Sequence, residues 1–589
     1  MVSNNKNRFD IFNNFILKLI FFAAIKFNKK KQNLKKYKFV LLILNITFSH
    51  TVFFNNKKLL HSKMAFTKSI LSVLILFFAG LNLFAQNQAL KLIDTADLMH
   101  HLSFLSSDSL QGRGFGTPLP GLDIAAAYLK VNIEKTGMAS GADDYFQEFP
   151  IISSQPDIEN TFLEITDADG NITFKTDSII ALPTGAGINI SDAEVIFAGF
   201  GWSDDKTGYN DLKGVDVRGK VVMIAMGTPD SFKAKELSRW NNSLETAKIK
   251  KAKEAGAALV IVINSSLDDG HSIYNRLNRW INRNDFSLEM PDNKAENSGF
   301  LFSTTSLADA LLGGKGKFQK NLAKISEKQH SHSYSIHGLR IKVKVNRKTE
   351  HIQAKNVIGI VEGSHPVLKD ECVVFMAHYD HLGIDNSNEV FNGADDNGSG
   401  TVALLEVAEA FMSLEPKPKR SLVFLWVTAE EVGMLGSKYY VVNPVFPIDK
   451  TVACINIDMA GRVFEQRDTV WNKSAKLVKD FDGIYALTNN IWPGLKEINT
   501  AACKTLDLIP DYSLPSGFLQ SSDHFSFHNH GVPVINYATG YHADYHKVTD
   551  EISRINFDKI KRIADLCFLV GHEIANCEKI EILKNEDKN

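Results

Sequence analysis

Histidines and acidic residues follow a series of apolar runs, and together these side chains could hold metal ions. They come after VVFMA, LVFLWVTA and VACINI, in the loop NGADDNGSG, and in two C-terminal segments. The residues concerned are His378, Asp380, Asp395, Asp396, Glu430, Glu431, Asp458, Asp523, His524 and His546. Carboxylates gathered this densely repel one another unless a cation lies among them. Imidazole and carboxylate ligands suit zinc, and two zinc ions can share a bridging carboxylate and a bridging hydroxide.

Each of these motifs alone has an ordinary structural interpretation. A Glu-Glu pair usually lies in a solvated loop, and a histidine at a strand end is more often simply hydrogen-bonded. The DDNGSG segment could be a turn or a calcium loop, but it lacks the further ligand spacing of an EF-hand. Additional calcium sites stay an open alternative. The order of the motifs, each after an apolar run, favours a shared catalytic site over coincidence.

The elements that must position these residues alternate between strands and helices from residue 354 onward. Continuous apolar runs such as KNVIGIVEG, CVVFMAHYD and TVACINIDMAG predict buried strands. Helices are expected over 400–412, 431–441, 474–490 and 553–575. This alternation predicts an α/β fold with a mainly parallel sheet that is covered on both faces. In such sheets, sites form at the carboxyl ends of the strands.

The segment 165–345 has a different residue pattern. It contains short strands separated by polar turns, and its GKVVMIAMG and KAKEAGAALVIVI units resemble a protease-associated (PA) domain. We therefore expect an inserted β-rich PA-like domain. The expected ranges are 86–160 and 350–577 for the catalytic domain, 161–349 for the insertion and 578–589 for a polar tail.

The charge distribution sets the N-terminal residues apart. Residues 1–85 contain 14 lysines and arginines and one acid. Because the whole chain has 66 basic and 67 acidic side chains, residues 86–589 hold 52 basic and 66 acidic ones. Residues 64–85 read as a signal peptide that starts at Met64, so we expect export to the periplasm or the medium. Residues 1–63 are interpreted as a non-native upstream extension, with a membrane anchor as the alternative. No stable membrane anchor is expected in the processed chain.

The composition excludes several classes of protein. It is 44% hydrophobic with a formal charge of −1, which argues against a disordered chain and against a nucleic-acid-binding protein. The five cysteines form no CxxC pair, and we expect them to pack in the core.

Five segments together resemble the M28 family of co-catalytic zinc peptidases, which includes secreted bacterial aminopeptidases. They are AHYDHLG, NGADDNGSG, TAEEVGMLGS, NIDMAG and DYHKVTDE, and they occur in the family's order. The resemblance implies two Zn²⁺ ions per chain. His378 and Asp458 would hold one ion, Glu431 and His546 would hold the other, and Asp395 would bridge both.

The resemblance also implies roles for residues around the metals. Glu430 would be the general base that takes a proton from the bridging water, leaving a metal-bridged hydroxide to attack the peptide carbonyl. Asp380 would orient the His378 imidazole. A cis peptide bond would join Asp395 to Asp396. The surroundings of the metals or the substrate pocket would include Asp523, His524, Tyr541, His542 and Tyr545.

The predicted function is a zinc-dependent exopeptidase that releases N-terminal amino acids from peptides. Two alternatives are also enzymes: a carboxypeptidase of the same family, or a relative of glutaminyl cyclases. A third alternative is a non-catalytic binding ectodomain of the same fold. Retention of all the implied ligands argues against that third alternative. The sequence does not identify the residue that stabilises the oxyanion, because GFLQ lacks a tyrosine before the SDH segment.

Overall fold

The computed structural model describes residues 84–176, 180–182, 187–229, 242–264, 285–289, 300–328, 330–385, 387–468 and 477–583. The predicted extension and almost all of the predicted signal peptide lie outside these residues. None of the helices within these ranges has the length and apolarity needed to cross a membrane.

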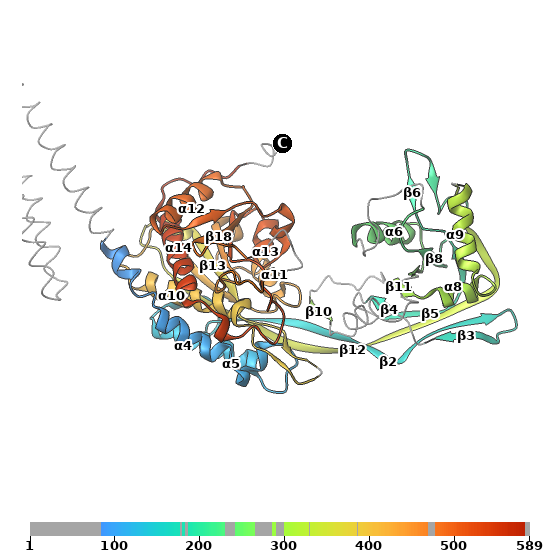
Figure 1. Ribbon diagram of the computed structural model, residues 1–589, viewed down its shortest axis with the longest axis horizontal. Helices are drawn as coiled ribbons and strands as arrows, with labels where there is room; N and C mark the ends of the chain where they lie inside the picture. The colour runs from blue at the N-terminus through green and yellow to red at the C-terminus, as the bar shows by residue number, and fades with distance from the viewer. Residues whose placement is uncertain are drawn as a thin grey trace, which may run out of the picture. The chain divides into compact units, whose positions relative to one another are not determined.

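The C-terminal half of the chain contributes a mostly parallel run of strands to one large sheet (Figure 1). The order is β19-β18-β20-β17-β13-β16-β12. The three central strands β17, β13 and β16 are parallel to one another. The strand bounds are β12 Tyr334–Val361, β13 Cys372–His378, β16 Ser421–Val427, β17 Thr451–Ile457, β18 Gly483–Thr488, β19 Ile509–Asp511 and β20 Val534–Ala538.

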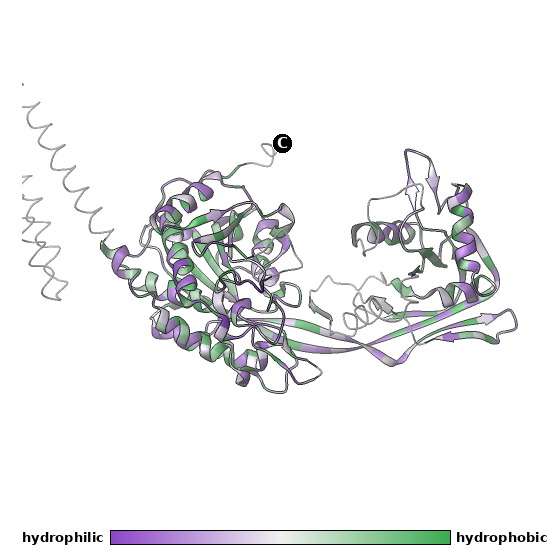
Figure 2. Ribbon diagram, viewed as in Figure 1, coloured by the Kyte–Doolittle hydropathy of each residue, from purple (hydrophilic) through white to green (hydrophobic). Residues whose placement is uncertain are grey.

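Helices cover both faces of this part of the sheet, as the continuous apolar strands predict. On β13, Val373 and Phe375 belong to one apolar cluster, whereas Val374 and Met376 belong to another. Figure 1 shows α10 and α14 on one side of β13 and α11 and α13 on the other. The helices are α4 Thr95–Leu105, α5 Gly121–Lys135, α10 Gly400–Met412, α11 Leu435–Val442, α12 Pro493–Thr505, α13 His524–Asn529 and α14 Phe557–Asn576. Figure 2 shows the central strands as largely hydrophobic, with polar residues on the helices.

The inserted part has an apolar core of its own. Its strands follow the order β5-β8-β9-β11-β4; β5, β8, β9 and β11 are parallel to one another, whereas β4 is antiparallel to β11. These strands are β4 Ile180–Leu182, β5 Ile188–Phe197, β8 Val221–Ala225, β9 Leu259–Ile263 and β11 Phe300–Ser303. Helices α6 Asn242–Glu254, α8 Thr305–Leu311 and α9 Lys317–Lys328 accompany them. The long strand β12 pairs with β5 at its start and with β16 at its end, and also with β2 Phe146–Asp167.

Two expected helices differ from the structure. The expected helix over 474–490 is wrong for its described part, because residues 483–488 form β18 and the helix comes later as α12. The helix expected from residue 431 begins only at Leu435. Residues 428–434, between β16 and α11, are a loop that carries the Glu430-Glu431 pair. The five cysteines are all free, and four of them are buried.

Candidate metal centre

The candidate site lies at the carboxyl ends of the three central strands. His378 is the last residue of β13, Glu430 and Glu431 follow β16, and Asp458 follows β17 directly. Because these strands are parallel neighbours, their carboxyl ends meet at one edge of the sheet. The loop Ala394–Ser399, which precedes α10, adds two aspartates.

The first group of ligand-type atoms contains His378, Asp396 and Asp458. The Nε2 atom of His378 lies 3.4 Å from Oδ1 of Asp458 and 3.5 Å from Oδ1 of Asp396. His378 is almost wholly buried. Burial alone would lower its pKa, but the carboxylates of Asp458, Glu430 and Asp380 raise that pKa well above its usual value.

The second group of ligand-type atoms contains His381, Asp396 and Glu431. His381 faces the other oxygen of Asp396, Oδ2, and His546 lies beside the same two carboxylates. The Nε2 atom of His546 lies 3.1 Å from Asp396 Oδ2 and 3.2 Å from Glu431 Oε2. His381 approaches the same glutamate from another direction, with Nδ1 2.8 Å from Glu431 Oε1. Burial would raise the pKa of Glu431, but hydrogen bonds from His381 and His546 hold it well below its usual range.

The expectation that Asp395 bridges the two groups is wrong. Its Oδ1 accepts a hydrogen bond of 2.6 Å from the backbone N–H of Gly461, and its Oδ2 lies 3.2 Å from Nε2 of His542. It belongs to neither group, and Asp396 takes the position between them. The cis peptide bond lies one residue further along than expected, between Asp396 and Asn397. Adjacent residues point in different directions, so the motif alone does not tell which aspartate faces the site.

Asp380 acts mainly on the backbone of the neighbouring loop. Its two carboxylate oxygens accept hydrogen bonds of 3.2 Å from the N–H groups of Glu430 and Glu431. The His378 Nδ1 atom lies 3.2 Å from the backbone carbonyl of Asp380 and 3.7 Å from its carboxylate. Asp380 therefore supports the predicted orientation of His378 chiefly through its carbonyl, while its carboxylate holds the glutamate loop.

Asp550 is a residue that the sequence interpretation left without a role, although it lies in the quoted DYHKVTDE segment. This buried carboxylate accepts hydrogen bonds of 3.0–3.1 Å from the backbone N–H groups of Asp395 and Asp396. Asp550 thus holds the aspartate loop in the same way that Asp380 holds the glutamate loop. Asp396 was among the candidate residues of the sequence but had no role as a ligand, and His381, in the same AHYDHLG segment as His378, had no role at all.

The predicted surroundings of the site divide into two sets. Asp523 and His524 are fully buried; burial raises the pKa of Asp523 to about 7 and lowers that of His524 to about 4. Tyr541 and Tyr545 form an aromatic wall, with ring centres 4.7 Å apart, and Tyr545 stacks on the His546 ring at 3.9 Å. His542 instead joins the network of Asp395, and its Nδ1 lies 2.8 Å from Nη1 of Arg462.

The charge balance at Glu430 suits a group that carries a proton. Burial raises the pKa of its carboxyl well above the usual range; His378 opposes this shift, and the nearby carboxylates of Glu431, Asp523 and Asp458 add to it. Burial and these carboxylates thus favour the protonated form of the Glu430 carboxyl, as a group that takes up a proton requires.

The residues present fit divalent metal ions. In each of the two groups, the ligand-type atoms lie within 4.8 Å of one another. Together the groups offer imidazole nitrogens and carboxylate oxygens, the donor set that zinc accepts. One carboxylate, that of Asp396, is common to both, as two adjacent ions require.

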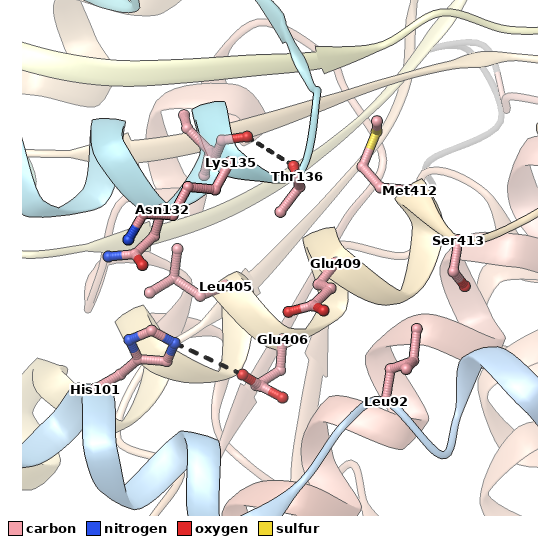
Figure 3. Close-up of a pocket in the computed structure, with 11 residues that line it drawn as sticks. Leu92, His101, Asn132, Lys135, Thr136, Leu405, Glu406, Glu409, Met412 and Ser413 are labelled. Carbon is pink, nitrogen blue, oxygen red and sulfur yellow. Dashed lines mark hydrogen bonds and ion pairs between the residues drawn. The ribbon is translucent and has the colours of Figure 1, made fainter.

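A separate hollow of about 340 Å³ lies between α4, α5 and α10 and contains none of the predicted site residues (Figure 3). Its buried carboxylate, Glu406, already has structural partners. Oε2 accepts a hydrogen bond of 3.1 Å from the backbone N–H of Asp94, and Oε1 lies 3.9 Å from Nε2 of His101. The hollow therefore has no part in the metal centre.

Comparison with known proteins identifies two regions. Residues 356–570 match peptidase family M28, and residues 190–284 match the PA domain. The M28 match begins inside β12 and includes every strand end that carries the site. The chain therefore carries a peptidase M28 domain and an inserted PA domain.

The matching relatives include bacterial and fungal proteins. Aminopeptidase YwaD of Bacillus subtilis is 30% identical over 234 residues, which are 38% of this chain and 46% of that protein. Leucine aminopeptidase 1 of Arthroderma otae is 30% identical over 214 residues, 35% of this chain and 55% of that protein. The chain thus spans about half the length of the curated relatives it matches.

A solved structure resembles most of the chain. The aminopeptidase from Aneurinibacillus sp. strain AM-1 aligns with a TM-score of 0.51 and 19% identity, covering 85% of this chain and 98% of that one. This likeness shows a shared fold.

Proposed function

We propose that the protein is a zinc-dependent metallopeptidase that releases N-terminal amino acids from peptides. The observation that carries this proposal is the position of Asp396, whose two oxygens face two different groups of histidine and carboxylate ligands. The names of the related aminopeptidases support the reaction class. The signal-like segment 64–85 supports an exported enzyme.

In this proposal the ligand set differs from the sequence prediction at one position. His378 and Asp458 would hold one zinc ion, Glu431 and His546 would hold the other, and Asp396 would bridge them. Bound zinc would polarise the peptide carbonyl and lower the pKa of a water molecule. The protein supplies the fixed directions of the ligands, through hydrogen bonds from their loops to Asp380 and Asp550.

Glu430 is the proposed proton carrier. Its carboxylate accepts the proton of the attacking water and returns it to the amine that leaves when the peptide bond breaks. The neighbouring carboxylates favour this cycle because they make the protonated form of Glu430 easier to reach. The Asp380 carboxylate fixes the backbone of Glu430, so that this side chain stays beside the metal ligand Glu431.

The amino end of the substrate is the proposed recognition point. A free amino terminus is a cation, and the site is lined with more carboxylates than two zinc ions would neutralise. The aromatic wall of Tyr541 and Tyr545 offers a surface for an apolar first side chain. A carboxypeptidase would instead need basic side chains there to bind a carboxylate.

The direct test combines one substitution with a substrate panel. Glu430→Gln should bind zinc normally and lose turnover by a factor of about 10² to 10⁴. Glu409→Gln, at an exposed position on α10, is the matched control and should keep wild-type activity. Free aminoacyl substrates should be hydrolysed in a chelator-sensitive way, whereas N-blocked substrates should not. Hydrolysis of blocked substrates alone, or an active Glu430→Gln variant, would overturn the proposal.

A further inference from the structure

Arg113 is a buried cation that the proposed mechanism does not use. It lies in the QGRGFGTP segment, far from the ligands in sequence, and only 1% of it is exposed. Within the described residues, its guanidinium donates hydrogen bonds to backbone carbonyls alone. The distances are 2.8 Å to Tyr379, 2.5 Å to Leu105, 2.7 Å to Asn392 and 2.8 Å to Gly393.

Three of these carbonyls belong to the two loops that carry proposed metal ligands. Tyr379 follows His378 directly, and its carbonyl accepts from Nε of Arg113. Asn392 and Gly393 lead into the loop of Asp396, and their carbonyls accept from the two terminal nitrogens. The carbonyl of Arg113 itself accepts a hydrogen bond of 3.2 Å from the N–H of His381.

The glycines on either side explain how the arginine reaches this position. A Cβ atom on Gly112, which has a φ of 66°, would lie 2.4 Å from the carbonyl oxygen of Phe391. A Cβ atom on Gly114 would lie 2.4 Å from the Cα atom of Gly383. The backbone of the segment can therefore pack closely against Gly383 and Phe391, and the arginine side chain enters between the loops.

The charge of Arg113 also faces the site. Burial lowers its pKa to about 10, while the negative charges of Asp380, Asp550, Asp396 and Glu431 counteract that shift. Asp380 holds the glutamate loop and Asp550 the aspartate loop by their N–H groups. Arg113 instead binds carbonyls directly after His378 and directly before the aspartate loop. The three residues together fix the backbone on both sides of the ligands.

We propose that Arg113 is a positioning residue of the metal centre, which sets the relative placement of the His378 and Asp396 loops and thereby the affinity for zinc. The inference rests on the proposed function. A guanidinium is suited to this role because its planar fork can bind several carbonyls at fixed angles at once. Groups that orient metal ligands typically change metal affinity by a factor of about 10 to 100 when they are removed.

The test uses two variants of Arg113 and a matched arginine. Arg420 is equally buried and also donates to two backbone carbonyls, those of Ile574 and Cys577, but it precedes β16 at the end of the strand opposite to the site. Zinc affinity is measured by competition with a chromophoric chelator. The visible absorption of the cobalt-loaded protein reports ligand geometry independently of activity.

Arg113→Gln should weaken zinc binding by about 10- to 100-fold and change the cobalt spectrum. Arg113→Lys, whose ammonium keeps three donors, should recover part of the loss. Arg420→Gln should lower thermal stability and leave both metal readouts as in the wild type. If the wild-type protein binds no zinc, the proposed function fails, and this inference fails with it.

Three results would overturn the role of Arg113 alone, with wild-type zinc binding intact. The first is an Arg113→Gln variant with unchanged zinc affinity and cobalt spectrum. The second is an equal loss of zinc affinity in Arg420→Gln. The third is unfolding of both Arg113 variants while Arg420→Gln folds, since that would assign Arg113 to general stability only.

Discussion

At the scale of single residues, acidic side chains that are neighbours in the sequence have different partners in the site. Asp395 is bound by Gly461 and His542, whereas Asp396 faces both ligand groups. The resemblance implied that Asp395 would bridge, and this was wrong, because the backbone directions of the loop decide which of the two aspartates faces the ligand groups. Glu430 and Glu431 were assigned separate roles from the resemblance, and the structure gives them different surroundings.

Asp380 allows a prediction at this scale. Asp380→Asn would leave one acceptor oxygen for the two N–H groups of Glu430 and Glu431. Zinc affinity should fall by about 10-fold or more because Glu431 is no longer held. The matched control is Asp385→Asn, an exposed aspartate that accepts from the N–H groups of Ser387 and Glu389. Equal zinc affinities in the two variants, measured by chelator competition, would refute the role of Asp380.

At the scale of elements, the packing of α14 on β13 depends on a glycine. A Cβ atom at Gly571 would lie 2.2 Å from Cζ of Phe375, whose ring stacks on Phe424 at 4.9 Å. Because that ring has no room to move, Gly571→Ala should destabilise the fold by about 1–3 kcal/mol, despite the better helix propensity of alanine. Gly517→Ala, where a Cβ meets no atom within 4 Å, should be close to neutral. Denaturant unfolding of both variants measures the difference.

Helix α10 contains a buried acid that should make stability depend on pH. Burial raises the pKa of Glu406 in the folded state from 4.5 to about 8. The folded protein then holds a proton there that the unfolded chain releases, so stability is lost as pH rises between about 4.5 and 8. Glu406→Gln keeps an acceptor for the Asp94 N–H and removes this loss.

The free energies of unfolding of wild type and Glu406→Gln should therefore diverge in favour of the variant as pH rises. The gap should change by up to about 1.4 kcal/mol per pH unit. Burial also raises the pKa of Glu409, which is exposed on the same helix, so the gap between wild type and Glu409→Gln should change with pH less than that of Glu406→Gln. A pH-independent gap between wild type and Glu406→Gln would contradict the shifted pKa.

At the scale of the whole molecule, the class of fold could be predicted from the sequence better than the details of the site. Apolar runs such as Val373–Ala377 are so continuous that only strands buried on both faces explain them. Residues 483–488, which form β18, were misassigned to a helix because a short apolar strand and a helix turn look alike in sequence. Arg113 and Asp550 could not be assigned, since their partners are backbone groups, which leave no residue pattern.

The two parts of the chain have separate apolar cores, one around β13 and one around β8. Zinc should therefore stabilise only the part that holds the site. We expect two thermal transitions, and a chelator should lower one of them by roughly 5–10 °C, given about 2.7 kcal/mol of stabilisation at a hundredfold excess of zinc over its dissociation constant. Calorimetry with and without chelator checks this; an equal shift of both transitions would argue against a metal centre confined to the M28 part.

The central claim is that Asp396, and not Asp395, joins two zinc sites. The most direct measurement is the zinc content of purified wild-type protein, Asp396→Asn and Asp395→Asn after equilibration with the same free zinc concentration. We expect two zinc ions per chain in the wild type and in Asp395→Asn, and one or fewer in Asp396→Asn. Two ions retained in Asp396→Asn, or a loss confined to Asp395→Asn, would contradict it.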